Sequence, residues 1–346
     1  MKIDDVGGWP AVLGALTSGR DLTAKQAGAA GAAVLSGDAT PAQIGAFIVA
    51  LRMKGESVVE IGALLDVMLE LAERVVLPDG MVAVDTCGTG GDGSCTINVS
   101  TIAAFVVAGA GVPVCKHGNR AASSACGSAD VLEALGVAIE LGPVGVARCV
   151  EQAGIGFCFA PRYHPAMRHA GPVRRELGVR TVFNFLGPMA NPGGVRRQVL
   201  GVSDPAMAAR MLGVLAARGA ERALVVYGHD GLDEFTTTTT STVHELRDGD
   251  ETTYDVDPRE LGLGVAPPEA LRGADAATNA KLARQVLEGE PGFQRDVVVL
   301  NAAAGIVVGG LADDLRAGIE LAIASIDGGK AVGALDRMIA ESQAPS

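Results

Sequence analysis

Two stretches rich in glycine, hydroxyl and charged side chains follow short apolar runs in the first half of the chain. The first, GTGGDG from Gly88 to Gly93, follows the strand-like run VAVDT from Val82 to Thr86. Glycines permit positive φ and let backbone N–H groups approach a ligand closely. A helix expected to begin near Asn98 would direct unpaired N–H groups and its positive dipole end to the same place. The pattern predicts an anion-binding loop.

The second stretch, from Lys116 to Ser128, follows the predicted buried strand Val112 to Cys115. It begins KHGNR and carries three serines before the helical pattern ADVLEALG. Lysine and arginine supply positive charge, asparagine an amide, and serine hydroxyl donors, all of which suit phosphate oxygens. Because open α/β sheets bind ligands at the carboxyl ends of their strands, we expect both loops to meet one phosphorylated ligand.

The first stretch also matches the dinucleotide fingerprint G-x-G-x-x-G by letter. That kind of site needs an acidic residue about 20 positions further on, at the end of the next strand. The next predicted strand ends in Lys116 and His117 instead, and the phosphate-binding pattern G-x-x-x-x-G-K-[ST] is absent from the sequence. A tight strand-to-helix turn without any ligand is the structural alternative for the first stretch taken alone.

The segments GTGGD, NVST, KHGNR and SSACGSADVLEALG, in this order, resemble the phosphoribosyl-diphosphate-binding signature of the anthranilate phosphoribosyltransferase family of tryptophan biosynthesis. Two later segments, VRRELGVRTVFNFLGP and GHDGLDE, match the same family. The resemblance implies transfer of the phosphoribosyl group of 5-phosphoribosyl 1-diphosphate to the amine of anthranilate, with release of diphosphate.

The resemblance also implies which residues bind each ligand. For phosphoribosyl diphosphate they are Gly88, Gly91, Asp92, Thr96, Asn98, Val99, Ser100, Thr101, Lys116, His117, Gly118, Asn119, Arg120, Ala121, Ala122, Ser123, Ser124 and Ser128. For anthranilate they are Gly88, Asn119 and Arg174, and for magnesium they are Ser100, Asp233 and Glu234, with two Mg²⁺ ions expected per subunit. No general base is assigned, because the amine of anthranilate is neutral at pH 7 and the transfer depends on positioning and electrostatics.

The acidic residues have simpler alternatives when the resemblance is set aside. Asp92 suits an Asx turn, although a carboxylate beside phosphates can also bind a cation or a hydroxyl group. The adjacent pair Asp233 and Glu234 suits a solvated loop, since paired carboxylates are mostly exposed. Asp230 lies in the same segment and is expected to form the turn.

The candidate cation for the carboxylate of anthranilate has a neighbouring competitor. Arg174 and Arg175 are adjacent in a predicted helix, and adjacent helical positions face about 100° apart, so only one can point inward. Without the resemblance, Arg174 would be an exposed helix arginine. His117 and His164 are expected to orient the pocket or to line it, without acting as a base.

Composition limits the class of protein. The chain has 346 residues, which makes two domains the default, and it is 48% hydrophobic but only 3% aromatic. The net charge of −12 opposes a nucleic acid backbone as the main partner. The cations that bind an anionic ligand must therefore be local, at Lys116 with Arg120 and at Arg174 with Arg175.

Neither export nor a membrane is indicated. The six cysteines show no CxxC pair and no zinc spacing, and the N-terminal residues lack a signal-peptide pattern. The longest apolar run, Ile102 to Cys115, is too short and too rich in glycine to cross a bilayer. We expect a cytoplasmic protein with reduced thiols.

Residues 8–75 carry the apolar periodicity of consecutive helices. Capping residues mark the helix starts: Thr23 with Gln26, Ser57 with Glu60, and Thr40 before Pro41. We expect a small all-helical domain over residues 1–75, joined by a helical insert at about 165–192 that the resemblance implies. A domain this small exposes apolar faces, which suggests that it packs against the rest of the chain or against a second subunit. Together with these apolar helices, the resemblance implies a homodimer formed through this domain.

Strands and helices alternate after this domain, which predicts a mostly parallel sheet flanked by helices. Strands are expected at 82–86, 112–115, 137–141, 157–160, 222–228, 242–246 and 252–256, and helices at 143–153, 164–177, 279–288 and 312–326. A threonine run at 236–240 favours an edge strand or a turn. The expected fold class is α/β, a small helical domain plus a catalytic domain over residues 76–346, as in nucleoside phosphorylases and phosphoribosyltransferases.

Two other functions are compatible with this architecture. A pyrimidine nucleoside phosphorylase also binds phosphate and ribose in glycine-rich loops, but the matched segments fit the transferase at more positions. A non-catalytic, nucleic-acid-binding relative of the fold is opposed by the acidic net charge and by the presence of Asp233 and Glu234. The expected partners are the two small-molecule substrates.

Overall fold

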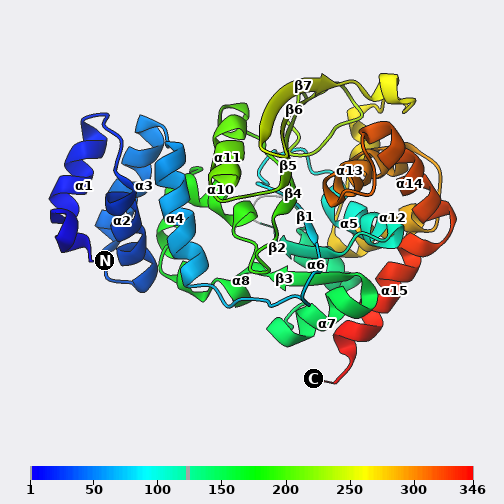
Figure 1. Cartoon of the computed structure of the whole chain (residues 1–346), viewed down its shortest axis with the longest axis horizontal. Helices are drawn as coiled ribbons and strands as arrows, with labels where there is room; N and C mark the ends of the chain where they lie inside the picture. Colours follow the sequence, from blue (N-terminus) through cyan, green and yellow to red (C-terminus); the bar gives the residue numbers. More distant parts are fainter. Residues whose placement is uncertain (1, 122–124, 346) are drawn as a thin grey trace.

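The computed structural model describes residues 2–121 and 125–345, and it confirms a small helical domain joined to a larger α/β domain (Figure 1). The N-terminal helices are η1 (Ile3–Val6), α1 (Gly8–Thr17), α2 (Ala24–Ser36), α3 (Pro41–Lys54) and α4 (Val58–Glu70). Thr23, Thr40 and Ser57 each accept a hydrogen bond from the backbone N–H three residues further on. The predicted helix starts are thus confirmed.

The α/β domain is built on a sheet with the order β3-β2-β1-β4-β5-β6-β7 among the described residues. Its strands are β1 (Val84–Gly88), β2 (Val114–Gly118), β3 (Ile155–Phe159), β4 (Arg197–Gly201), β5 (Arg222–Gly228), β6 (Ser241–Arg247) and β7 (Asp250–Val256). The first five pair in parallel, whereas β6 and β7 are antiparallel. This mostly parallel sheet confirms the predicted fold class.

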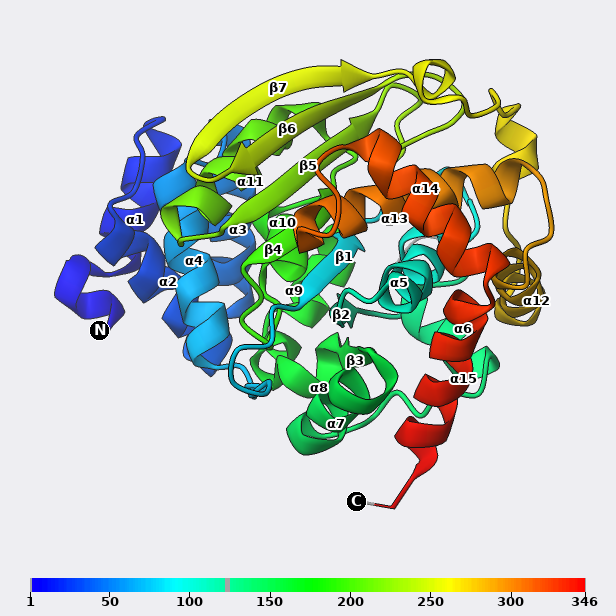
Figure 2. The ribbon, with the colours of Figure 1, turned by 45° about the vertical axis from the view of Figure 1, so that its right-hand side comes forward.

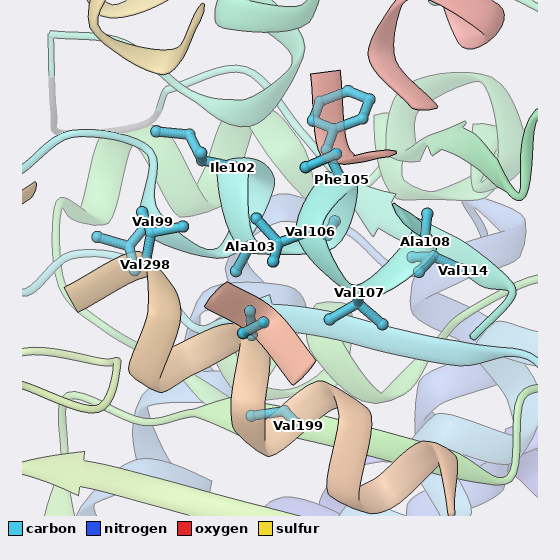
Figure 3. Close-up of a cluster of buried hydrophobic side chains, with 14 of the residues drawn as sticks. Val99, Ile102, Ala103, Phe105, Val106, Val107, Ala108, Val114, Val199 and Val298 are labelled. Carbon is cyan, nitrogen blue, oxygen red and sulfur yellow. The ribbon is translucent and has the colours of Figure 1, made fainter. Parts of the chain in front are cut away.

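Helices cover both faces of the sheet (Figures 1 and 2). One face is covered by α5 (Val99–Ala110), α12 (Ala276–Leu287), α13 (Phe293–Gly309), α14 (Leu315–Asp327) and α15 (Lys330–Gln343). Figure 3 shows α5 packed by valine and alanine side chains against Val298 of α13 and Val199 of β4. This close packing fixes the start of α5 next to the end of β1.

The opposite face carries the N-terminal helices together with α10 (Val182–Met189) and α11 (Pro205–Ala217). The N-terminal helices share one hydrophobic core with residues of both helices, including Phe185, Leu186 and Met211. Of the elements that follow β3, α8 (Ala160–Tyr163) contacts β3, whereas η2 (Pro165–Arg168) contacts α2 and α9 (Gly171–Leu177) contacts α3. The division of the chain at residues 75 and 76 remains a proposal.

Three sequence-based assignments were wrong. The expected strand at 137–141 is extended but unpaired with the sheet: Val137 and Ile139 are buried, while the N–H of Ala138 donates to Ser342 Oγ of α15. The expected helix at 164–177 is broken between η2 and α9. Pro165 is the first residue of η2, and Pro172 lies in the first turn of α9, where it has no N–H to continue a helix from η2. Strand β4 was missed, since RQVLG contains only two adjacent apolar residues.

The shorter elements complete the description. They are α6 (Ser128–Ala134), α7 (Pro143–Ala153), η3 (Pro258–Leu261) and η4 (Pro268–Leu271). The threonine run at 236–240 forms an irregular turn before β6. In the described ranges, none of the helices combines the length and the apolar character needed to cross a membrane.

Candidate active site

The first glycine-rich loop leaves β1 at Gly88 and reaches α5 at Val99. A Cβ on Gly88 would lie 2.2 Å from Asp233 Oδ2, and one on Gly201 would lie 1.5 Å from the carbonyl oxygen of Asp233. Only glycine therefore lets the ends of β1 and β4 approach the turn that carries Asp233. The N–H of Gly90 donates to Asp233 Oδ2 at 2.6 Å, which fixes the loop to this carboxylate.

Three carboxylates gather at this edge of the sheet, from Asp92, Asp233 and Glu234. Glu234 Oε1 accepts a hydrogen bond from the N–H of Ser100 in the first turn of α5 at 3.1 Å. Burial, and next the charge of Asp92, raises the pKa of Asp233 to about 6. Burial, and next the charge of Asp233, raises the pKa of Glu234 to about 8. Burial and mutual repulsion thus favour the protonated forms of these carboxyl groups, and the charge of Lys116 offsets part of this effect at Glu234.

A divalent cation suits this set of donors, because magnesium prefers carboxylates completed by waters and phosphate oxygens. Within residues 2–121 and 125–345, no three His, Cys, Asp or Glu side chains are placed to hold a metal ion by themselves. Waters or phosphate oxygens would supply the remaining donors to a cation held by these carboxylates. Asp92 also forms the Asx turn that was the alternative interpretation, accepting from Ser94 N at 3.1 Å and from Ser94 Oγ at 2.6 Å.

Lys116 lies beneath the first loop instead of facing an open site. Its side chain is buried, and Nζ donates to the carbonyl oxygen of Thr86 and to Ser100 Oγ. Its positive charge acts to lower the pKa of the buried carboxyl groups of Asp85 and Glu234, against the larger effect of burial, which raises both. The ammonium group thus compensates carboxylates of the protein beneath Ser100.

The second loop compensates its own charges. The guanidinium of Arg120 pairs with Asp130 at 2.9 Å and Glu133 at 2.7 Å and lies over the ring of Phe159. Asp130 Oδ2 also accepts from the N–H groups of Ala121 at 3.1 Å and Gly127 at 2.9 Å. Asp130 therefore joins the two ends of the loop, a role that the sequence analysis did not predict.

The remaining residues of the predicted phosphate site differ in their exposure. Asn98 joins the two loops, because its Nδ2 donates to the carbonyl oxygen of Cys126 at 3.1 Å. Val99 and Thr101 are buried in α5, so their side chains are directed away from an open site. Gly91 and Asn119 are exposed, whereas Gly88, Asp92, Thr96, Ser100, Gly118, Ala121 and Ser128 are half-buried. Ala122, Ser123 and Ser124 lie outside the described residues.

The two adjacent arginines of α9 are separated as helix geometry requires. Arg174 is half-buried and lies over the ring of Phe183, 5.7 Å from its centroid, whereas Arg175 is exposed. Burial lowers the pKa of Arg174. With the described residues Arg174 forms no ion pair, so its charge is available to an anionic ligand.

Two histidines pack against each other behind the second loop. Their rings lie 5.1 Å apart, His117 Nδ1 is 3.0 Å from the carbonyl oxygen of Gly187, and His164 Nε2 is 2.9 Å from that of Ala190. Burial, and next the charge of His164, lowers the pKa of His117 to about 3, and burial also lowers the pKa of His164. Both rings are therefore neutral at pH 7.

The candidate metal ligands Asp233 and Glu234 lie on the turn after β5. Asp230 Oδ1 accepts from the N–H of Leu232 at 3.2 Å, and its Oδ2 accepts from Thr236 Oγ1 at 2.6 Å. Asp230 thus forms the turn, as the sequence predicted, and this turn places Asp233 and Glu234 at the carboxyl edge of the sheet.

One arginine at the site was missed. Arg180 lies between α9 and α10, and its Nη1 donates to Ser203 Oγ at 2.6 Å. A Cβ on Gly91 would lie 2.7 Å from Arg180 Nη2, so the guanidinium occupies the space that a side chain at Gly91 would need. The segment VRRELGVRTVFNFLGP contains this arginine, but nothing in its spacing indicates a contact with a loop almost 90 residues earlier.

Comparison with known proteins first defines the class. Residues 10–72 match the helical bundle domain of the glycosyl transferase family, and residues 80–332 match the α/β domain of the same family. These ranges correspond to the two parts of the fold.

Individual relatives then define the member of the class. The chain is 54% identical over 333 residues to the anthranilate phosphoribosyltransferase of Chloroflexus aggregans, covering 96% of this chain and 97% of that one. The crystal structure of the Thermus thermophilus anthranilate phosphoribosyltransferase superposes with a TM-score of 0.91 at 43% identity, covering 96% of this chain and 99% of that one. The Saccharomyces cerevisiae enzyme, solved in complex with PRPP and Mg, gives a TM-score of 0.87 at 27% identity, with 96% and 97% covered.

The chain belongs to the anthranilate phosphoribosyltransferase family, whose members are transferases of tryptophan biosynthesis. The high identity over nearly the whole chain favours this function over that of a nucleoside phosphorylase or a non-catalytic relative. The predicted family and fold class are confirmed.

Proposed function

We propose that this chain transfers the phosphoribosyl group of 5-phosphoribosyl 1-diphosphate to anthranilate at the carboxyl edge of its sheet, in a reaction that depends on Mg²⁺. The observation that carries the proposal is the convergence of Asp233 and Glu234 with the two glycine-containing loops. Gly90 and Ser100 donate their N–H groups to these two carboxylates, which ties the first loop and α5 to the candidate metal ligands.

The phosphoribosyl diphosphate is proposed to lie across both loops. Backbone N–H groups around Gly91 and hydroxyl groups such as Ser128 Oγ are suited to phosphate oxygens. The full proposed set is Gly88, Gly91, Asp92, Thr96, Asn98, Val99, Ser100, Thr101, Lys116, His117, Gly118, Asn119, Arg120, Ala121, Ala122, Ser123, Ser124 and Ser128. Because Val99 and Thr101 are buried, they would contribute only through the backbone at the start of α5.

Anthranilate is proposed to bind between Gly88, Asn119 and Arg174. The half-buried guanidinium of Arg174 has no carboxylate partner among the described residues, so it can pair with the carboxylate of the substrate without losing an internal ion pair. If the site holds the amine of anthranilate opposite the leaving diphosphate, the two substrates react within one complex, and the entropic cost of bringing them together is met on binding.

Asp233, Glu234 and Ser100 are the proposed ligands of the metal, with two Mg²⁺ ions per subunit. When bound, the metal supplies positive charge that neutralises the diphosphate as it leaves. Protein residues act by position: Gly90 N–H orients Asp233, and Ser100 N–H orients Glu234. No side chain is assigned as a general base.

The helical domain is proposed to form a homodimer, and the protein to be cytoplasmic. Met53 of α3 is 84% exposed and Val59 of α4 is 54% exposed, which supports an apolar surface on this domain. Light scattering should give twice the mass of the chain, and Met53→Lys should shift the population toward monomer. A monomeric parent protein would contradict the dimer.

The first test follows the fluorescence of anthranilate with purified protein. The signal should fall only when both phosphoribosyl diphosphate and Mg²⁺ are present. A fall without added metal, in the presence of a chelator, would contradict metal dependence. Release of free base from a pyrimidine nucleoside in phosphate, with no consumption of anthranilate, would favour the phosphorylase instead.

A further inference from the structure

The anion site requires a positive charge, but its expected lysine is buried and its expected arginine is already paired with carboxylates. Lys116 is 2% exposed and donates to Thr86 and Ser100. Arg120 is paired with two carboxylates, those of Asp130 and Glu133. The first loop, in contrast, lies beside carboxylates that repel a diphosphate. A further cation at this loop would reduce that repulsion.

Arg180 is placed to supply this charge. Its guanidinium lies against Gly91, with Nη2 2.7 Å, Cζ 3.2 Å and Nε 3.3 Å from the position a Cβ would take. Gly91 has φ of +72°, so both its backbone conformation and the adjacent arginine favour glycine there. Arg180 is half-buried and forms no ion pair with the described residues.

Ser203 holds the guanidinium in this position. Ser203 Oγ accepts from Arg180 Nη1 at 2.6 Å and donates to the carbonyl oxygen of Gly90 at 3.0 Å. Its N–H donates to Thr89 Oγ1 at 3.3 Å. Ser203 thus connects Arg180 to the backbone of the first loop, while N–H groups at Nη2 and Nε are left for another acceptor.

We propose that Arg180 is a further substrate-binding residue, whose guanidinium contacts the diphosphate group of phosphoribosyl diphosphate at the Gly90–Gly91 turn. A guanidinium offers paired N–H donors that match phosphate oxygens, and the half-buried position strengthens the attraction. This inference rests on the proposed function for the identity of the ligand. It separates the roles of two unpaired arginines, with Arg174 for the carboxylate of anthranilate and Arg180 for the diphosphate.

The test measures binding without turnover, using inorganic pyrophosphate as the probe in calorimetric titrations with and without Mg²⁺. Arg180→Ala should weaken pyrophosphate binding by about 10- to 100-fold, the usual contribution of a charged hydrogen bond. Arg180→Lys should recover part of the loss, because lysine keeps the charge but loses the forked geometry. The exposed neighbour gives the control, and Arg175→Ala should bind pyrophosphate like the parent.

Steady-state kinetics provide the second measurement. Arg180→Ala should raise the KM for phosphoribosyl diphosphate and leave the KM for anthranilate within about threefold, whereas Arg174→Ala should do the reverse. Unchanged pyrophosphate affinity in Arg180→Ala, or a change confined to anthranilate, would overturn the proposal.

Two further variants keep the proposal testable if Arg180→Ala does not fold. Ser203→Ala removes the hydroxyl that accepts from the guanidinium and donates to Gly90, and it should weaken pyrophosphate binding by a few-fold. Parental affinity in both Ser203→Ala and Arg180→Lys would refute the role. If the parent chain binds pyrophosphate but does not consume anthranilate, the proposed function fails while the contact of Arg180 is still measured.

Discussion

The two loops at the carboxyl edge of the sheet have similar sequences of small and polar residues but opposite electrostatics. The first loop, after β1, lies next to Asp92, Asp233 and Glu234. Burial, and next the like charges of this group, raises the pKa values of Asp233 and Glu234. The second loop, after β2, compensates its arginine internally through Asp130 and Glu133. The first loop therefore borders an excess of negative charge that Lys116 and Arg180 offset only in part, whereas the second loop pairs its arginine internally.

This difference indicates how the two loops divide the work. A loop bordered by an excess of carboxylates gains stability when a divalent cation binds with its anionic substrate. A loop whose charges are paired internally keeps its shape before the substrate arrives. We therefore expect changes at the first loop to alter metal-dependent turnover, and changes at the second loop to alter mainly the affinity for phosphoribosyl diphosphate.

The largest effect is expected at the carboxylates of the first loop. Asp233→Asn with Glu234→Gln should reduce turnover by on the order of 10³-fold, because the charges that attract the metal are removed. The melting temperature should stay the same or rise, since buried like charges are neutralised while acceptors for Gly90 and Ser100 remain. Near-parental activity in the double variant would refute the metal assignment.

The next largest effect is expected at Arg174, the arginine proposed to bind the carboxylate of anthranilate. Arg174→Ala should raise the KM for anthranilate by about 10- to 100-fold and change that for phosphoribosyl diphosphate little. Because Arg174 makes no ion pair with the described residues, thermal unfolding should change little. Arg175→Ala is the matched control, and equal effects of the two substitutions would argue against a specific carboxylate contact.

A smaller effect is expected from loosening the second loop. Asp130→Asn weakens the pairing with Arg120 and the charge-assisted bonds from Ala121 and Gly127, so the KM for phosphoribosyl diphosphate should rise by roughly 10-fold. Glu133→Gln touches only Arg120 and should have a weaker effect. If Asp130→Asn lowers turnover at saturating substrate as strongly as the carboxylate double variant does, the contrast between the loops is wrong.

The smallest effect is expected from acid, through the histidines behind the second loop. Burial lowers the pKa of His117 to about 3 in the folded protein, whereas an unfolded histidine has a pKa of about 6.5. As the pH falls below 6.5, the unfolded chain therefore takes up a proton on His117 while the folded chain does not. The contribution of neutral His117 to the free energy of unfolding is therefore fully present above pH 6.5, and about 2 kcal/mol of it is lost at pH 5. Urea unfolding at pH 7.5 and pH 5 should show a smaller loss for His117→Asn than for the parent. An equal loss in both would exclude His117 as the source.

The sequence predicted the helical domain and most of the sheet because their signals are local. Capping boxes mark the starts of α2, α3 and α4, and runs of aliphatic, β-branched or aromatic residues mark β5, β6 and β7. It failed where a partner distant in sequence decided the outcome. Residues 137–141 have the alternation of a strand, but Ala138 bonds to Ser342 instead of to a neighbouring strand.

The candidate site shows the same division. Residue types and their order determined that two loops after successive strands would bind a phosphorylated ligand, and the resemblance supplied the family. Only the tertiary structure decided which charges are available: Lys116 is buried beneath Ser100, Arg120 is paired, and Arg180 reaches Gly91 from a distant segment. The physical reason is that a sequence fixes the number of charges, whereas burial and pairing across distant segments determine which of them a ligand can reach.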